Sequence, residues 1–263
     1  MTSAITEYEE RGFIYRPGLL TPDEVKTITD ELDRILAGGP RPGIVLEKDG
    51  VTPRSVFNPH LYSDVFDRVM RHPRLLGAVE ELLGEQVYTF QLLVNTKAAF
   101  NGDIWYWHQD YPTYRADDNI AECRMVNTLI FLDEVSHYNG PLMIVPGSHR
   151  IEDVPEESDQ GTSYTLRYTG TELIESEVRR GGIEAPTGPA GSVIFMNPNA
   201  LHGSGPNLSP WSRRLITLTY NAMSNKATAP TRRSRDIVLD DTNAPAVEPL
   251  GDDCLLAGAT AAG

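Results

Sequence analysis

The sequence places His108 and Asp110 two residues apart and a further histidine, His202, far downstream. On an extended strand, residues i and i+2 point to the same face, so this imidazole and this carboxylate can reach one ion. Two histidines and one carboxylate bind one face of a six-coordinate ferrous ion and leave its other positions open for chemistry. The pattern predicts a non-haem Fe(II) oxygenase, in which two segments distant in sequence must lie side by side.

From residue 86 onward, short apolar runs alternate with Gly, Pro, Asn and Asp. This pattern is typical of several short strands joined by turns. It favours an antiparallel sandwich or a closed barrel over a parallel α/β sheet. The predicted strands are 87–95, 125–132, 142–145, 192–196 and 215–220.

The segment 1–85 is predicted to be mostly helical and to support the sheet. A Thr-Pro-Asp-Glu run at 21–24 begins a helix, with a capping Thr, Pro in the first turn and Glu three residues after the Thr. Gly-Gly-Pro at 38–40 ends it. Two further helices are expected, one beginning at Ser63 and one ending at Gly84.

The length of 263 residues suits one domain, 1–263, with no internal repeat. Its parts are the helical support at about 1–85, a strand-rich core at about 86–225 and an irregular tail at about 226–263. The polar stretch 150–189 is expected to be a long insertion that acts as a lid, because long loops in compact domains are often functional. The tail is a second candidate to close over the pocket.

The formal net charge of −14 opposes binding to nucleic acid or to an anionic membrane surface, because both need a positive footprint. No apolar run approaches the length of a membrane span, and the polar N-terminus lacks the features of a signal peptide. Two cysteines, Cys123 and Cys254, do not form a disulfide framework. We therefore expect a cytoplasmic protein with a small-molecule partner, for which a homodimer is possible.

A second candidate for the downstream ligand is His149, which follows a predicted strand and precedes the polar stretch. His202 is favoured because Arg213 follows it on a predicted strand, whereas no strand with a suitable arginine follows His149. The remaining histidines have no partner at metal-binding spacing and are expected to be structural: His60, His72 and His137.

An arginine matters because an Fe(II) oxygenase generally needs an electron-donating co-substrate such as 2-oxoglutarate. The distal carboxylate of 2-oxoglutarate needs a permanently charged, bidentate donor, which arginine supplies better than lysine. Arg213 and Arg214 both lie on the strand after His202. Neighbours on a strand face opposite sides, so only one of the two can point inward.

Four segments extend this pattern. They read Gln-x-x-x-Asn-x-Lys at 91–97, Tyr-Trp-His-x-Asp-Tyr-x-Thr-Tyr at 106–114 and Asn-Gly-Pro-Leu-Met-x-x-Pro-Gly-Ser-His at 139–149. The fourth reads His-x-Ser-x-x-Asn-x-Ser-Pro-Trp-x-Arg from residue 202, with Tyr-Asn at 220–221. Together these motifs resemble the phytanoyl-CoA dioxygenase family of Fe(II)/2-oxoglutarate oxygenases, and within it the ectoine hydroxylases and free amino-acid hydroxylases.

The resemblance implies a mainly β fold with N-terminal helices, whose core is a double-stranded β-helix, or cupin-like jelly roll, with iron at one open end. It maps the catalytic iron ligands onto His108, Asp110 and His202, and it makes His149 a turn residue. It maps the distal carboxylate of 2-oxoglutarate onto Arg213. Further polar contacts to the co-substrate are expected from Ser204, Asn95, Thr128 and Gln91.

The implied cofactors are Fe(II), with 2-oxoglutarate and O₂ as co-substrates. Related halogenases replace the ligand carboxylate by a small residue, so Asp110 predicts hydroxylation of an unactivated C–H. For the substrate we favour a small amino-acid-like or zwitterionic molecule, since the chain shows neither a phosphate-binding glycine loop nor a basic patch for a larger anion. Candidate substrate contacts are Gln91, Tyr106, Tyr111, Tyr114 and Trp211.

Two alternatives remain at this point. Within the same class, the chain would hydroxylate or desaturate a larger natural-product or acyl intermediate. In a different class, it would be a metal-binding jelly-roll protein without redox activity.

Overall fold

The computed structural model describes residues 3–39, 41–151, 156–159, 166–234, 236–238 and 242–256. The α-helices are α1 (Ala4–Arg11), α2 (Pro22–Ala37), α3 (Asp64–Met70), α4 (Pro73–Leu83), α5 (Tyr111–Asp117) and α6 (Thr171–Gly181). The 3₁₀ helices are η1 (Pro59–Leu61), η2 (Ser148–Arg150) and η3 (Met223–Asn225). The first six strands are β1 (Phe13–Arg16), β2 (Ile44–Leu46), β3 (Pro53–Phe57), β4 (Val87–Lys97), β5 (Trp105–His108) and β6 (Met125–Phe131). The others are β7 (Met143–Ile144), β8 (Glu156–Asp159), β9 (Leu166–Thr169), β10 (Val193–Met196), β11 (His202–Ser204) and β12 (Arg213–Ala222).

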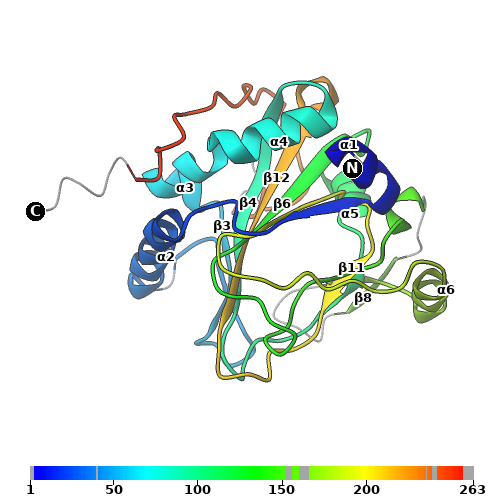
Figure 1. Cartoon of the computed structure of the whole chain (residues 1–263), viewed down its shortest axis with the longest axis horizontal. Helices are drawn as coiled ribbons and strands as arrows, with labels where there is room; N and C mark the ends of the chain where they lie inside the picture. Colours follow the sequence, from blue (N-terminus) through cyan, green and yellow to red (C-terminus); the bar gives the residue numbers. More distant parts are fainter. Residues whose placement is uncertain are drawn as a thin grey trace, which may run out of the picture.

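Two antiparallel sheets form the jelly roll (Figure 1). The large sheet has the order β1-β10-β6-β12-β4-β3-β2, and the small sheet has the order β5-β11-β7. The long central strand β12 pairs with β4 on one side and with β6 on the other. Because side chains alternate along each strand, every second residue of these three strands faces the space between the sheets.

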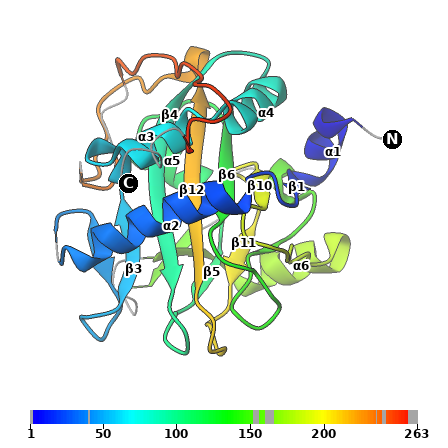
Figure 2. The same cartoon turned by 60° about the vertical axis from the view of Figure 1, so that its left-hand side comes forward.

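Helices cover the outer face of the large sheet. Figure 2 shows α2 crossing its strands. Apolar residues of α2, α3 and α4 pack with the outward-facing residues of the sheet into one buried cluster, which includes Ile28, Phe66, Leu76, Val94 and Ile216. A second cluster, with Leu129, Phe131 and Leu215 among its members, fills the space between the sheets. The helices therefore stabilise the sheet from outside, and its inner face is left to form a pocket.

The predicted helix starts and stops are found where the sequence placed them. Thr21 caps α2 with the reciprocal Thr–Glu arrangement of a capping box, Ser63 is the N-cap of α3, and Gly84 ends α4 in the left-handed region with φ of 74°. The predicted helical support also contains three strands, β1, β2 and β3, which pair into the large sheet. Their short runs have no strong alternation, so pairing with other strands determines their conformation: β1 pairs with β10, β3 with β4, and β2 with β3.

The stretch 150–189 contains the strand pair β8–β9 and helix α6, whereas the sequence predicted only a loop. Strand β9 lies along β5, and the ring of Tyr168 lies 5.8 Å from the ring of Tyr106. Residues 152–155 and 160–165 of the predicted lid lie outside the described residues.

The described parts of the tail return to the core. Val247 donates its backbone N–H to Val87 O, and Leu250 donates to Arg71 O. None of the described helices is both long enough and apolar enough to cross a membrane.

Candidate active site

Strand pairing brings the two predicted histidine ligands together. His108 ends β5 and His202 begins β11, and the two residues are direct partners in the small antiparallel sheet. Their ring centroids lie 4.2 Å apart. Asp110 Oδ1 lies 3.3 Å from His108 Nε2, and Asp110 Oδ2 lies 3.7 Å from His202 Nε2. One ligand atom from each of these three residues lies within 4.8 Å of the other two, so they can share one ion.

The backbone reaches this arrangement by a different route from the one predicted. Strand β5 ends at His108, and Asp110 is the N-cap of α5 with helical φ and ψ of −81° and −38°. The N–H groups of Asp110 and Tyr111 both donate to Pro198 O, at 2.8 Å and 3.1 Å. The chain therefore turns after the strand, and a loop carbonyl holds that turn. The carboxylate reaches the histidines because the helix begins there, not because of strand alternation.

Backbone carbonyls orient both imidazoles. His108 Nδ1 lies 2.6 Å from Tyr106 O, and His202 Nδ1 lies 2.9 Å from Ala200 O. A carbonyl only accepts hydrogen bonds, so each Nδ1 carries the proton and each Nε2 presents its lone pair to the common point. The same arrangement of a ring N–H held by the protein is usual for metal-binding histidines.

The protonation states of this set suit a divalent cation. Burial raises the pKa of Asp110, but the imidazoles of His202 and His108 and the amide of Asn127 outweigh it and hold the pKa at about 2. Burial and the neighbouring His108 lower the pKa of His202 to about 4. At neutral pH the site therefore has an ionised carboxylate and a neutral His202 imidazole, which are the forms that bind metals.

Asn127, on β6, is a contact that the sequence did not predict. Its Nδ2 donates to Asp110 Oδ2 at 2.6 Å, and its Oδ1 accepts from Thr219 Oγ1 at 2.7 Å. Both partners of the Asp110–Asn127 hydrogen bond lie on the inner side of the large sheet. Strand alternation contains the signal for this residue, because Asn127 precedes the inward-facing Leu129 by two positions.

A cavity of about 440 Å³ opens beside the candidate ligands. Strands β4 and β12 contribute alternate residues to its wall, as the pleat requires. The lining residues from these two strands are Gln91, Leu93, Asn95, Arg213, Leu215 and Thr217.

Arg213 lies at one end of this cavity and is 3% exposed. Its Nε donates to Gly140 O at 3.1 Å, and its Nη2 donates to Ser204 Oγ at 3.0 Å. Burial lowers the pKa of Arg213 to about 10, so the guanidinium stays charged at neutral pH. Arg214 faces the opposite side of the strand and pairs with Asp133 at 2.8 Å. Of the two adjacent arginines, Arg213 is the one that points into the cavity.

The other predicted co-substrate contacts divide into two groups. Gln91, Asn95 and Ser204 line the cavity. Gln91 Nε2 donates to Ile237 O at 3.0 Å, and Asn95 accepts from Ser55 Oγ at 3.0 Å. Thr128 does not line the cavity, because it alternates with Asn127 and Leu129 and so faces the helices. The structure therefore corrects the prediction for Thr128.

Among the predicted substrate contacts, Tyr106 and Tyr114 line the cavity. Tyr111 does not: it packs in a separate buried cluster, and its hydroxyl donates to Ala121 O at 2.8 Å. Trp211 also lies elsewhere, in the loop before β12 with 62% of its surface exposed. The predictions for Tyr111 and Trp211 are corrected, because the turn into α5 redirects the first side chain and the second precedes the strand.

The end of the cavity remote from Arg213 carries charged residues that the sequence did not indicate. Asp117 comes from α5, and Arg233 comes from the tail. Arg233 Nε donates to Asp118 Oδ1 at 2.9 Å, and its Nη2 donates to Asp118 Oδ2. The guanidinium lies 5.6 Å from the centre of the Tyr114 ring. Two tail residues, Arg233 and Ile237, also line the cavity. Their segment has no periodic pattern, so the sequence does not indicate that they face the cavity.

His149, the alternative ligand, lies apart from this cluster. It is in η2, and its Nε2 lies 3.1 Å from Glu9 O. Among the described residues, the group able to hold a metal consists of His108, Asp110 and His202.

Several known proteins resemble this chain in sequence and in structure. The ectoine dioxygenase of Bordetella bronchiseptica is 33% identical over 239 residues, which cover 86% of this chain and 77% of the relative. L-proline trans-4-hydroxylase of Streptomyces griseoviridis is 31% identical over 243 residues, which cover 88% and 90%. The crystal structure of EctD from S. alaskensis with 2-oxoglutarate and 5-hydroxyectoine matches with a TM-score of 0.82 at 29% identity, covering 94% of this chain and 86% of EctD.

The family model of phytanoyl-CoA dioxygenase (PhyH) matches residues 8–215, which include most of the jelly roll and the whole candidate metal site. By this match and by its relatives, the chain belongs to the phytanoyl-CoA dioxygenase family.

Proposed function

We propose that this protein is an Fe(II)/2-oxoglutarate-dependent dioxygenase that hydroxylates an unactivated C–H of a small, amino-acid-like substrate. One observation carries the proposal: the His108–Asp110–His202 group and the buried Arg213 guanidinium open into the same cavity. A metal-binding protein without redox activity has no need of a buried arginine beside the metal, and hydrolytic zinc sites favour three histidines or two histidines and a glutamate.

Different residues of the cavity would bind the metal and the co-substrate. His108, Asp110 and His202 would hold Fe(II), and Arg213 with Ser204 would bind the distal carboxylate of 2-oxoglutarate. When bound, Fe(II) and 2-oxoglutarate supply the oxidising chemistry, in which O₂ and 2-oxoglutarate become succinate and CO₂ while a substrate C–H becomes C–OH.

Apolar walls then keep bulk water from the reacting centre. Leu129, Leu142 and Leu215 line the cavity near the arginine, so the carboxylate–guanidinium pair forms in a dry environment that strengthens it.

The remote end of the cavity supports a zwitterionic substrate. Asp117 and Arg233 bring charges of both signs to the wall. Nε and Nη2 of Arg233 donate to Asp118, and no described residue accepts a hydrogen bond from Nη1. We propose that Arg233 binds a substrate carboxylate while Tyr114 packs against the substrate carbon skeleton.

The cavity volume favours a small substrate over the larger natural-product or acyl intermediate. About 440 Å³ must hold 2-oxoglutarate together with the substrate, which leaves room for a molecule of amino-acid size. Two relatives are named for ectoine and for L-proline, which are both small molecules.

A substrate panel tests the proposal. Free amino acids and cyclic amino-acid derivatives are incubated with the protein, Fe(II), ascorbate and 2-oxoglutarate, and succinate is measured. We expect at least one compound to stimulate succinate formation and to gain one oxygen atom by mass spectrometry. His202→Ala provides the inactive control. Product formation that does not require 2-oxoglutarate would contradict the proposal, as would succinate formation that persists in the His202→Ala variant. Homodimer formation and a cytoplasmic location stay predictions from the sequence.

A further inference from the structure

One flank of the cavity is lined by apolar side chains. They are Val45 from β2, Phe57 from β3, Leu93 from β4 and Trp105 from β5. We call these four residues the apolar flank. Phe57 and Leu93 are buried, and Val45 and Trp105 are half-buried. The proposed function assigns no role to any of them.

Strand pairing places Phe57 and Leu93 beside each other on the inner face of the large sheet. The two residues are direct partners across β3 and β4, and Leu93 is in turn the partner of Thr217 on β12. Thr217 lies four residues from Arg213, which corresponds to about 13 Å along an extended strand. The apolar flank therefore lies toward the edge of the sheet formed by β2 and β3, and away from the proposed carboxylate anchor.

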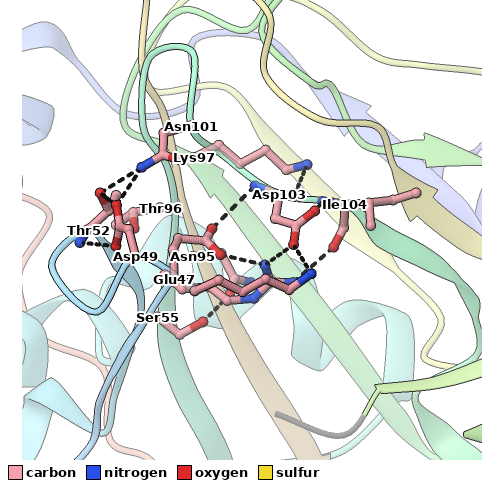
Figure 3. Close-up of polar contacts among 12 residues, drawn as sticks. Glu47, Asp49, Thr52, Ser55, Asn95, Thr96, Lys97, Asn101, Asp103 and Ile104 are labelled. Atoms are coloured by element: carbon pink, nitrogen blue, oxygen red, sulfur yellow. Dashed lines mark hydrogen bonds and ion pairs between the residues drawn. The ribbon is translucent and has the colours of Figure 1, made fainter. Parts of the chain in front are cut away.

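A buried clasp holds Trp105 against the same edge. Trp105 begins β5 of the small sheet, and the guanidinium of Arg54 lies 4.4 Å from the centre of its ring. Arg54, on β3, is buried and donates to Ile104 O and to Glu47 Oε2, both at 2.9 Å. The N–H of Asp103 donates to Glu47 Oε1 at 3.3 Å, and Figure 3 shows Glu47 beside the segment 103–104. The edge of the large sheet is thereby fastened to the start of β5, and the indole ring closes the apolar flank.

Polar side chains next to the apolar flank bind one another. Val45 is the Cα partner of Ser55, whose hydroxyl donates to Asn95 Oδ1 at 3.0 Å (Figure 3). Asn95 Nδ2 donates to Thr217 Oγ1 at 3.4 Å. Because these groups are paired within the protein, a ligand group that enters the flank meets mainly carbon atoms. A carbon chain gains free energy by burial there, whereas a hydroxyl or an amide loses its hydrogen bonds to water.

The apolar flank begins next to the candidate metal site. Gln91 precedes Leu93 by two positions on the same face of β4, and it is the partner of Thr219. Thr219 donates to Asn127, which in turn donates to Asp110. Two residues of a strand span about 7 Å, so a substrate bound beside the metal can reach the flank with a branch of a few carbons.

We propose that the apolar flank is a subsite for an uncharged, apolar branch of the substrate, and that the substrate is an amino-acid-like molecule with an aliphatic side chain. The inference rests on the proposed function, because it needs a substrate beside the metal. The charged wall with Arg233 would bind the polar head of this molecule. The apolar flank would bind the side chain, and so it would determine which amino acid is accepted.

Binding calorimetry tests the subsite. Alanine, 2-aminobutyrate, norvaline, valine and leucine are titrated anaerobically into the protein loaded with Fe(II) and 2-oxoglutarate. Threonine and asparagine are the polar counterparts of valine and leucine. We expect the affinity to rise by about fourfold for each methylene that enters the flank. The heat-capacity change of binding should become more negative along the series, because burial of apolar surface has that sign. Each polar counterpart should bind more weakly than its apolar partner.

Two variants of Val45 connect the preference to the apolar flank. Val45→Phe fills the subsite, so the ratio of leucine affinity to alanine affinity should fall by about tenfold or more. Val45→Thr keeps the shape and adds a hydroxyl, so the same ratio should fall by about fivefold or more. Val51→Phe is the matched control, because Val51 lies in the turn of the same β2–β3 hairpin, is 78% exposed and does not line the cavity. Circular dichroism and thermal unfolding confirm that each variant is folded.

The outcomes separate the subsite from the proposed function. Equal wild-type affinity for alanine and leucine, or a preference for threonine and asparagine, overturns the subsite and leaves the proposed function standing. A leucine-to-alanine ratio that both Val45 variants leave unchanged has the same meaning. If Val45→Phe does not fold, Val45→Thr and the wild-type series still decide. If no linear or cyclic amino acid binds or stimulates succinate formation, the proposed function fails together with this inference.

Discussion

Asn127 Nδ2 lies 2.6 Å from Asp110 Oδ2, while Asn127 Oδ1 accepts a hydrogen bond from Thr219 Oγ1 at 2.7 Å. The hydroxyl determines which end of the amide faces the carboxylate, because a carbonyl oxygen there would repel it. The amide occupies one carboxylate oxygen and leaves Oδ1, which lies near His108, for the metal. A neutral side chain on β6, 17 residues further along the chain, thus orients the acidic ligand.

Asn127→Leu should weaken metal binding by about ten- to a hundredfold, as is usual when a residue that orients a metal ligand is removed. Equilibrium titration with Fe(II) or Co(II) measures the change. Thr128→Val is the matched control on the same strand, because Thr128 faces the helices and its hydroxyl has no hydrogen-bond partner among the described residues. Equal metal affinity in the wild type and Asn127→Leu would remove Asn127 from the site.

Arg213→Lys should raise the KM for 2-oxoglutarate by about thirtyfold or more, which corresponds to about 2 kcal/mol or more for a truncated buried charge pair. Lysine keeps the positive charge but loses the planar, two-pronged donor that matches a carboxylate. Steady-state kinetics at saturating amino acid would measure this. The neighbouring Arg214→Lys should leave the KM unchanged, and an equal effect of both substitutions would point to a loss of fold instead.

Arg233→Met should raise the KM for the amino-acid substrate by about tenfold or more while leaving the KM for 2-oxoglutarate unchanged, because one buried charge-assisted contact contributes at least 1.5 kcal/mol or so. Arg232→Met is the control, since Arg232 is its exposed neighbour. A rise in both KM values would show that Arg233 supports the fold of the pocket and does not bind the substrate.

Burial of His60 should make the free energy of unfolding depend on pH. Burial lowers the pKa of His60 from 6.5 to about 4. Below pH 6.5 the unfolded chain therefore binds a proton that the folded chain refuses, and the free energy of unfolding falls as pH decreases toward 4. Relative to His60→Gln, the wild type should lose up to about 1.4 kcal/mol per pH unit in this window. Urea unfolding at several pH values measures the difference, and a constant difference would contradict the burial of His60.

The main strands and the candidate ligands could be predicted because their signals are local. The apolar runs that became β4, β6, β10 and β12 are regular enough to identify, and the family motifs identify the histidines and Asp110. The sequence does not show which face of each strand points inward. Which of two neighbouring residues faces the pocket depends on pairing with distant strands. The resemblance predicts Thr128 as a co-substrate contact, but strand pairing turns that side chain toward the helices and its neighbour Asn127 toward the site.

The substrate end of the pocket was harder to predict because its residues come from irregular backbone. Tyr111 turns away because α5 begins at that residue, and helical geometry points Tyr114 to the cavity. Arg233 and Ile237 reach the wall from a tail without periodicity. Two hydrogen bonds from Arg233 to Asp118 and one from Gln91 to Ile237 O hold them there. No pattern in the sequence encodes such contacts, since each depends on the finished fold.

The residues proposed to bind the substrate and those proposed to bind iron and 2-oxoglutarate lie on different kinds of backbone. Of the residues proposed to handle iron and the keto acid, His108, His202 and Arg213 stand on paired strands, where one replacement disturbs a whole ladder of hydrogen bonds. Arg233 lies on an irregular stretch that follows β12 and η3. Descendants of such a chain can therefore exchange this stretch and acquire new substrates while inheriting the oxidation machinery intact.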